Sequence, residues 1–233
     1  MIIGSGLIAT AFLERAGELE GVCVFASGVA NSMNKDEKEF LRESSMLKNS
    51  LNSLAPNDQF VYFSTCSVYD KMSIDTAYVQ HKIKMESIVL QRPRSHVFRL
   101  PQLAGLSRNG NTLLNYINSS IERGELMRIW SKAERNIIDV SDVVSVVIHL
   151  LRASPQQNLL SNICNPTHVL VLDLVKKLEE IKGRKARLEV VDGGGAYVIP
   201  LGDTIEIYSK IGLNFQEGYI SSVLKKYYSN RVL

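Results

Sequence analysis

Three side chains of this sequence have the types and the spacing that proton transfer at an alcohol or a ketone requires. Thr65 comes just after the apolar run 60–63, Tyr78 follows thirteen residues later, and Lys82 follows Tyr78 by four residues. Four-residue spacing places Tyr78 and Lys82 one turn apart on the same face of a helix. A free phenol has a pKa of about 10, and a neighbouring ammonium lowers that value because it favours the phenolate. The set therefore predicts a general acid/base at Tyr78, with the hydroxyl of Thr65 orienting the reacting oxygen beside a hydride transfer.

The spacing of Tyr78 and Lys82 has little weight alone, because Tyr-x-x-x-Lys arises often by chance. Its position is more informative, since a predicted strand ends in S-T-C-S-V-Y over residues 64–69, shortly before Tyr78. The competing interpretation is an ordinary tyrosine–lysine pair on a helix surface. His81 lies inside the same helical turn and is expected to face the solvent.

A glycine-rich segment opens the chain and could hold a phosphate group. Residues 4–9 read G-S-G-L-I-A, which fits G-x-G-x-x-A between a short apolar strand and a helix. In this pattern Gly4 allows a tight turn, Gly6 lets a pyrophosphate approach the backbone, and Ala9 permits close packing of helix on strand. Free N–H groups at such a turn favour an anion. The segment predicts dinucleotide binding, although a plain strand-to-helix turn would look the same. A second segment, 26–30, follows the next strand and brings backbone close to a ligand or simply makes a turn.

Segments that alternate in type must position these residues. Strands are expected at 1–4, 22–26, 59–64, 96–100 and 160–164. Helices are expected at 7–16, 36–54, 78–90, 112–122, 172–181 and 218–228, and another is expected to begin at Ser141, which can cap it. Such alternation predicts a parallel sheet covered by helices.

The composition excludes several classes of protein. The net charge of +3 is spread along the 233 residues without a basic block, so nothing supports nucleic-acid binding. No apolar run approaches the roughly 18 residues of a membrane span, and the start M-I-I-G lacks the features of a signal peptide. Cys23, Cys66 and Cys164 lie far apart without metal-ligand spacing. We therefore expect a cytoplasmic protein with structural thiols and no metal site.

These motifs resemble the NAD-dependent epimerase/dehydratase family, the extended branch of the short-chain dehydrogenase/reductase superfamily, which acts mainly on nucleotide sugars. In that family the catalytic serine or threonine lies four residues before the tyrosine of a Val-Tyr pair, a position that falls on Thr65. The family's Tyr-x-x-x-Lys falls on Tyr78 and Lys82. The resemblance continues through 98–105, 135–143, the Asn-Pro at 165–166, and 209–213.

The resemblance also implies which residues bind ligands. Arg135 takes the place of the arginine that meets the nucleotide-sugar diphosphate, although a surface salt bridge suits one arginine nearly as well. Ser67 and Gln102 join Arg135 as implied substrate-binding residues. The implied cofactor is NAD or NADP, bound by Gly4, Ser5, Gly6, Leu7, Ile8, Ala26, Ser27, Gly28, Ser64, Tyr78, Lys82, Leu100 and Pro101. Family dimers imply a homodimer formed through 36–54 and 78–90.

The sequence departs from the family pattern in its first half. Only the strand at 22–26 fits between the glycine segment and the catalytic strand, so we infer that the family's second and third strands, at one edge of the sheet, are missing. No acidic residue follows the second strand to hold the adenosine ribose, and no arginine stands there for a 2′-phosphate. The choice between NAD and NADP therefore stays open. Gln102 and Asp139 also replace the family's usual Asn and His.

The sequence thus predicts an α/β fold: a Rossmann-like parallel sheet flanked by helices, without two edge strands, and with a small C-terminal substrate lobe. The cofactor-binding core spans 1–106 and 135–165, and the smaller substrate-binding lobe spans 107–134 and 166–233. The predicted activity is an NAD(P)-dependent oxidoreductase, epimerase or dehydratase acting on a nucleotide-activated sugar. The alternative is a non-catalytic or regulatory relative that kept Thr65, Tyr78 and Lys82 but binds cofactor weakly.

Overall fold

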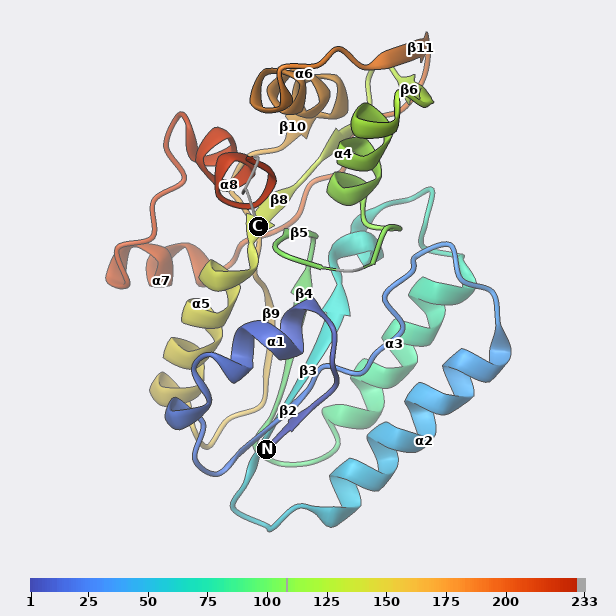
Figure 1. Cartoon of the computed structure of the whole chain (residues 1–233). Helices are drawn as coiled ribbons and strands as arrows, with labels where there is room; N and C mark the ends of the chain where they lie inside the picture. Colours follow the sequence, from blue (N-terminus) through green and yellow to red (C-terminus); the bar gives the residue numbers. More distant parts are fainter. Residues whose placement is uncertain (108, 230–233) are drawn as a thin grey trace.

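A five-stranded parallel sheet forms the centre of the molecule in a computed structural model that describes residues 1–107 and 109–229 (Figure 1). The strands lie in the order β1-β2-β3-β4-β9 and every neighbouring pair is parallel. Their bounds are β1 Ile2–Ile3, β2 Val22–Phe25, β3 Gln59–Thr65, β4 Ser95–Leu100 and β9 Leu159–Asn162. The predicted α/β architecture is confirmed, and each of the five expected strands is present within two residues of its expected bounds.

Helices cover both faces of this sheet because alternate strand residues point to opposite sides. On β3, Val61 and Phe63 pack with α1 and α5, while Phe60 and Tyr62 pack with α2 and α3. The helices of this core are α1 Leu7–Leu13, α2 Glu37–Ser53, α3 Ala77–Val89 and α5 Val140–Ala153. Short 3₁₀ turns lie at Ala16–Glu18 and Cys66–Tyr69. Since β3 is central and buried on both faces, its carboxyl end at Thr65 is held rigidly.

Side-chain caps fix where the main helices begin. Asp36 accepts a hydrogen bond from the Lys38 N–H at the start of α2, and Thr76 accepts one from the Val79 N–H at the start of α3. At α5 the predicted cap was wrong. Asp139, two residues earlier than the predicted cap, accepts from the N–H of Ser141 at 2.8 Å. Ser141 instead donates its own hydroxyl to the same carboxylate.

A smaller lobe lies beyond the carboxyl end of the sheet, at the top of Figure 1. It packs α4 Leu113–Arg123, α6 Val171–Lys182 and α8 Tyr219–Tyr228 around one hydrophobic cluster. Two parallel strands, β6 Leu126–Trp130 and β11 Arg187–Val191, close its outer side. Short pairs join lobe and core: β5 Gln102–Ala104 with β8 Ile137–Asp139, and β7 Glu134–Arg135 with β10 Val169–Leu170. A last helix, α7 Thr204–Lys210, packs on α5.

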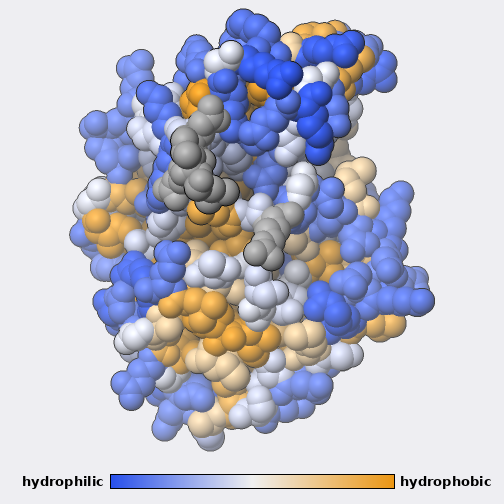
Figure 2. Space-filling view, viewed as in Figure 1, coloured by the Kyte–Doolittle hydropathy of each residue, from blue (hydrophilic) through white to orange (hydrophobic). Residues whose placement is uncertain are grey.

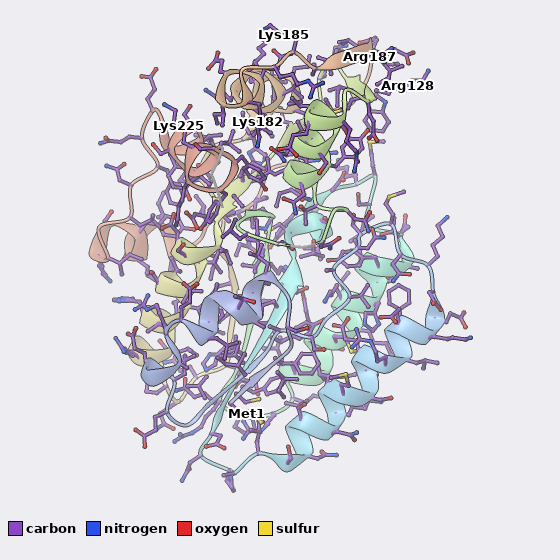
Figure 3. The ribbon with its side chains drawn as sticks, in the orientation of Figure 1. Met1, Arg128, Lys182, Lys185, Arg187 and Lys225 are labelled. Carbon is purple, nitrogen blue, oxygen red and sulfur yellow. The ribbon has the colours of Figure 1, made fainter. Side chains whose placement is uncertain are left out.

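Basic side chains at the tip of this lobe are paired with acids. Figure 3 labels Lys182, Lys185 and Arg128 around α6 and β6. Their ammonium or guanidinium groups lie 2.7 Å from Glu122, 3.0 Å from Glu179 and 3.0 Å from Glu189. Exposed pairs of this kind contribute little to stability. They do balance the local charge, so the tip is no open basic surface in the described residues.

The sheet is open at β1, which has β2 as its one neighbour among the described strands. Two strands inferred to be missing from the sequence would lie on this side. Hydrophobic side chains gather over α1 and this edge (Figure 2). Met1, just before β1, and Leu13, the last residue of α1, are 61% and 58% exposed. In the described part of the chain, the sheet therefore ends at β1. None of the helices in the described part of the chain is long and apolar enough to cross a membrane.

Candidate active site

The predicted catalytic side chains meet at the carboxyl end of β3. Thr65 is its last residue, and the 3₁₀ turn and loop that follow return the chain to α3, whose first turn carries Tyr78. The hydroxyl of Thr65 lies near enough to that of Tyr78 to lower the pKa of the phenol, and both residues are buried. The Lys82 ammonium lies 5.9 Å from the centre of the Tyr78 ring. Thus strand, turn and helix bring together three residues spread over 18 positions of the sequence.

Lys82 points into the protein interior, under the tyrosines. Its ammonium lies 3.0 Å from the Glu43 carboxylate and 5.0 Å from the centre of the Tyr62 ring. It also donates to the backbone oxygen of Phe63 at 3.4 Å. Only 3% of the side chain is exposed. Lys82 therefore carries a charge close to Tyr78, but that charge is shared with a buried carboxylate.

The phenol of Tyr78 is not activated by its surroundings as the sequence predicts. Burial raises the pKa of Tyr78 to about 12, the nearby hydroxyl of Thr65 lowers it, and the negative charge of Glu43 raises it further. The main physical reason is that the buried phenolate would lose its solvation, and the Glu43 carboxylate also disfavours a second negative charge nearby. In this state Tyr78 is a protonated acid.

The glycine turn at residues 4–6 has the close approach that the motif predicts. Gly4 has a φ of +130°, a conformation that disfavours other residues, and a Cβ there would collide with the carbonyl of Ala26. Nothing lies within 4 Å of a Cβ built on Gly6, so its backbone faces open space. That space is a cavity of about 630 Å³ lined by Ser5, Gly6, Leu7, Thr10, Leu106, Ser107 and Asn109.

Other predicted cofactor residues surround the same end of the sheet. Ala26 and Ser27 follow β2 directly, and Leu100 and Pro101 end β4. The buried hydroxyl of Ser64 has no hydrogen-bond partner among the described residues. Ile8 is half-buried in α1, where it packs on the core. An elongated ligand laid from the cavity to Tyr78 would pass these groups, so the residues present fit a dinucleotide along the phosphate and nicotinamide part of its length.

The predicted substrate side contains Ser67 and Arg135, together with a residue that the sequence did not reveal. The hydroxyl of Tyr197 lies close to Ser67 and Arg135, which both lower its pKa, and close to Tyr78. His168 packs edge-on against its ring, with 6.2 Å between ring centres. Tyr197 belongs to the irregular segment after β11, which carries no motif, so pattern alone gave no signal for it.

Two predicted substrate residues, Arg135 and Gln102, make hydrogen bonds to the protein backbone. Arg135 donates from its guanidinium to the backbone oxygen of Glu134 at 2.6 Å. Gln102 begins β5, where its N–H donates to the carbonyl of Asn136. Asp139, which stands in the family's histidine position, binds Lys226 at 2.8 Å and Tyr227 at 2.6 Å. Asp139 thus fastens α8 to α5 and has a structural role.

Glu43 is the residue that sequence reasoning missed completely, and His81 is one that it placed wrongly. His81 does not face the solvent: its side chain is 8% exposed, stacks on Phe40, and lies 3.2 Å from Glu43. Glu43 sits on the buried face of α2 at 0% exposure. An acidic residue inside a run of charged ones reads as solvated, so only the packing of α2 on α3 reveals both positions.

No group of three histidine, cysteine, aspartate or glutamate side chains that could hold a metal ion occurs in residues 1–107 and 109–229. The thiols of Cys23, Cys66 and Cys164 are buried and free. Burial raises the pKa of Cys23 to about 11 and that of Cys164 to about 12. Neutral thiols in apolar surroundings are unreactive, so these residues are structural.

Comparisons with known proteins agree with this geometry. A model of the NAD dependent epimerase/dehydratase family matches residues 9–164. No curated protein sequence matches the chain. Among solved structures, UDP-galactose 4-epimerase is 14% identical with a TM-score of 0.69, and 88% of this chain covers 75% of that one.

Two further structures show the same fold. The dTDP-glucose 4,6-dehydratase of Bacillus anthracis, solved with NAD, is 16% identical with a TM-score of 0.64, and 95% of this chain covers 78% of it. RMD from Pseudomonas aeruginosa, solved with NADPH, is 16% identical with a TM-score of 0.67, and 89% of this chain covers 80% of it. All three chains extend beyond the part that this protein covers.

Proposed function

Because the chain belongs to the NAD-dependent epimerase/dehydratase family, we propose that it is an NAD(P)-dependent enzyme that acts on a nucleotide-activated sugar at Tyr78. The observation that carries the proposal is the meeting of Thr65, Tyr78 and Lys82 at the end of β3. The glycine turn and its cavity lie at the same edge of the sheet. Sugar-nucleotide enzymes and their nicotinamide cofactors appear among the structures of the same fold.

Each residue has a definite role in this proposal. Tyr78 transfers the proton of the reacting sugar hydroxyl, and Thr65 hydrogen-bonds the same oxygen and fixes its position. Lys82 supplies the positive charge that favours the phenolate, and contacts the nicotinamide ribose. The bound cofactor supplies or accepts the hydride. Gly4, Ser5 and Gly6 hold its pyrophosphate, with Leu7 and Ile8 behind them.

The remaining site residues bind the two ends of the ligands. Ala26, Ser27 and Gly28 pass behind the cofactor, while Ser64, Leu100 and Pro101 border its nicotinamide. Ser67 and Gln102 contact the sugar, and Arg135 turns from the Glu134 carbonyl to the diphosphate, which a guanidinium binds in bidentate fashion. The lobe built from 107–134 and 166–233 holds the nucleotide, although residues 108 and 230–233 lie outside the described part.

The proposal also covers the oligomeric state and the cellular location. We propose a homodimer through α2 and α3, supported by Leu41, which is 65% exposed on α2. A Leu41→Asp variant then runs as a monomer in light scattering after gel filtration, while an Ile205→Asp variant on α7 stays dimeric. The three free thiols support a reducing, cytoplasmic location.

A second candidate function is a non-catalytic relative that binds cofactor weakly. One observation favours it: Lys82 is bound to Glu43, and the pKa of Tyr78 is raised to about 12. The intact Thr65, Tyr78 and Lys82 favour the enzyme instead, because a protein without chemistry needs no such set.

Cofactor titration and turnover separate the two candidates. NADH and NADPH are titrated into the protein while nicotinamide fluorescence is followed, and UDP- and dTDP-sugars are then supplied with the bound cofactor. The enzyme binds at least one cofactor below millimolar concentration and turns over a sugar nucleotide. Tyr78→Phe should bind cofactor normally and lose turnover by a factor of about 10² or more. Tyr69→Phe removes a control phenol, which lies on the 3₁₀ turn after Thr65 and accepts hydrogen bonds from Arg99 and Asn162, and should retain turnover.

Lack of binding to either cofactor would exclude the enzyme. Turnover that survives in Tyr78→Phe would remove Tyr78 from the mechanism. Cofactor binding without turnover of any sugar nucleotide would leave the non-catalytic candidate.

A further inference from the structure

We propose that Glu43 is a positioning residue, which fixes the ammonium of Lys82 beneath Tyr78 and ties both to the segment after β2. The proposal rests on the proposed function of Tyr78 and Lys82. It assigns to α2, which carries no catalytic motif, a direct effect on the Tyr–Lys pair.

The carboxylate of Glu43 is the centre of a buried network. Its Oε1 accepts from the Tyr62 hydroxyl at 2.6 Å and from the Lys82 ammonium at 3.0 Å. Its Oε2 accepts from the Val29 N–H at 2.6 Å and lies 3.2 Å from the Nε2 of His81. Four groups therefore surround a side chain that is 0% exposed.

The four groups come from each element that builds the site. Tyr62 is on β3, three residues before Thr65, and Lys82 and His81 are on α3 with Tyr78. Val29 follows Gly28 in the segment predicted to pass behind the cofactor. One carboxylate thus sets the spacing between strand, helix and cofactor segment.

Stability alone does not explain a buried ion pair here. Desolvating two charges costs about as much as their attraction returns, and well-packed apolar residues often stabilise a core as well or better. Lys82 and Glu43 are almost fully buried between α2, α3 and β3. The pair therefore points to a requirement for a fixed charge beneath Tyr78.

The Lys82–Glu43 pair explains why position 28 is a glycine. A Cβ built on Gly28 would lie 2.5 Å from the Lys82 Nζ and 3.0 Å from the Glu43 Oε1. Its backbone has no left-handed φ that would itself demand glycine. The missing side chain at position 28 therefore makes room for the ammonium and the carboxylate. The sequence pattern alone had assigned this glycine to cofactor binding.

Burial and the neighbouring charges shift the pKa of Lys82 in opposite directions. Burial lowers the pKa of Lys82, whereas the charge and hydrogen bond of Glu43 raise it. Burial alone would raise the pKa of Glu43, but its four partners hold it at about 2. The other titratable or charged groups facing Lys82 are Arg42 from α2, Tyr62 from β3, and Tyr78 and Glu86 from α3. Glu43 is the one in direct contact with the ammonium, so it decides whether Lys82 stays charged.

The first test measures Lys82 directly and needs no substrate. The full-length protein is labelled with isotopic lysine, and the side-chain nitrogen of Lys82, assigned by its loss in Lys82→Arg, is titrated by NMR. Glu43→Gln keeps the shape of Glu43 and removes its charge, so the pKa of Lys82 should fall by about one unit or more. Glu43→Asp, which keeps the charge, should lower it less.

Glu86→Gln is the matched control, since Glu86 is also buried on α3 and paired to a cation, Arg99, at 2.6 Å. It should destabilise the protein like Glu43→Gln but change the Lys82 titration less. Gly28→Ala provides a second route if Glu43→Gln does not fold, because its methyl group displaces the ammonium while Glu43 remains. The ammonium protons of Lys82, which exchange slowly with solvent while the group is buried, should then exchange faster in the NMR spectrum.

The second test is kinetic. With a sugar nucleotide that the wild type turns over, Glu43→Gln should lower kcat about tenfold or more and leave KM for the sugar nearly unchanged, as expected for a group that acts through the reacting pair. Its pH–rate profile should shift, whereas that of Glu86→Gln should keep the wild-type shape.

The outcomes distinguish this proposal from the proposed function. If Glu43→Gln lowers only the melting temperature, with the Lys82 titration and the pH profile unchanged, Glu43 is merely structural and the inference fails. If no variant and no wild type turns over any sugar nucleotide, the proposed function fails. The Lys82 titration still decides the link between Glu43 and Lys82 in that case.

Discussion

Individual residues of this site divide into those that spacing reveals and those that packing reveals. Tyr78 and Lys82 were predictable because one helix turn joins them, and Thr65 because a strand end precedes them. Glu43 and Tyr197 were not, because each reaches the site from another element, 22 residues before Thr65 or 119 residues after Tyr78. A single sequence carries no signal for contacts across such separations. His81 shows the same limit, since a helix position reads as solvent-facing until its neighbouring helix is known.

A pH dependence of stability follows from one buried histidine. Burial lowers the pKa of His96 to about 4. Its Nε2 pairs with Gln59 at 3.0 Å, and its Nδ1 has no partner among the described residues. The neutral ring is therefore the folded form, while the unfolded chain takes up a proton below its ordinary pKa of about 6.5.

The sign of this effect is fixed by which state holds the proton. Between pH 6.5 and 4, roughly, the unfolded state binds one more proton, so stability falls as the pH falls and then levels. Between pH 7 and 5 the loss should be about 2 kcal/mol. Urea unfolding at both values measures it. His96→Gln should lose less over this range than the wild type, and His149→Gln, on α5, should lose the same amount as the wild type.

At the scale of elements, the strands and helices of the core and the three main helices of the smaller lobe, α4, α6 and α8, followed from local pattern, whereas the strands of the lobe did not. β6 and β11 pair across 61 residues, Leu126 with Arg187 through Trp130 with Val191. Each segment is only five residues long, and the partner that stabilises it is far away in the sequence. The strands of the pairs β5–β8 and β7–β10, which fasten the lobe to the core, are shorter still.

The start of α5 is where one side chain holds two elements. Asp139 caps α5 through the Ser141 N–H and binds Lys226 and Tyr227 on α8. Asp139→Ala removes the cap, worth about 1 kcal/mol, and leaves the Tyr227 hydroxyl and the Lys226 ammonium of α8 with the Ser141 hydroxyl in place of a carboxylate. The total loss of unfolding free energy should be about 2 kcal/mol or more.

Thr112 at the start of α4 is the matched control. It occupies the cap position without a side-chain cap hydrogen bond. Thr112→Ala should therefore cost less than about 0.5 kcal/mol, the range of ordinary surface substitutions. Chemical denaturation of both variants compares them, and equal losses would contradict the anchoring role of Asp139.

At the scale of the whole molecule, the sheet ends at β1, beside the glycine turn. Among the described residues, no further strand lies outside β1 to supply an acidic or basic residue for the adenosine ribose. Discrimination between NAD and NADP normally depends on such a residue. We therefore expect NADH and NADPH to bind with dissociation constants within about tenfold of each other, since tenfold corresponds to only about 1.4 kcal/mol. Competitive fluorescence titration checks this, and a preference of a hundredfold would show that another segment rebuilds the adenine site.

The open edge at β1 also has a consequence for the order of events in a catalytic cycle. A cofactor anchored at its pyrophosphate and nicotinamide, but not at its adenine, dissociates faster than one held along its whole length, because affinity differences appear mainly in the dissociation rate. Short residence favours exchange of cofactor between turnovers. The same shortening that leaves Thr65, Tyr78 and Lys82 untouched would therefore suit a net redox reaction better than one that must return its hydride before the cofactor leaves.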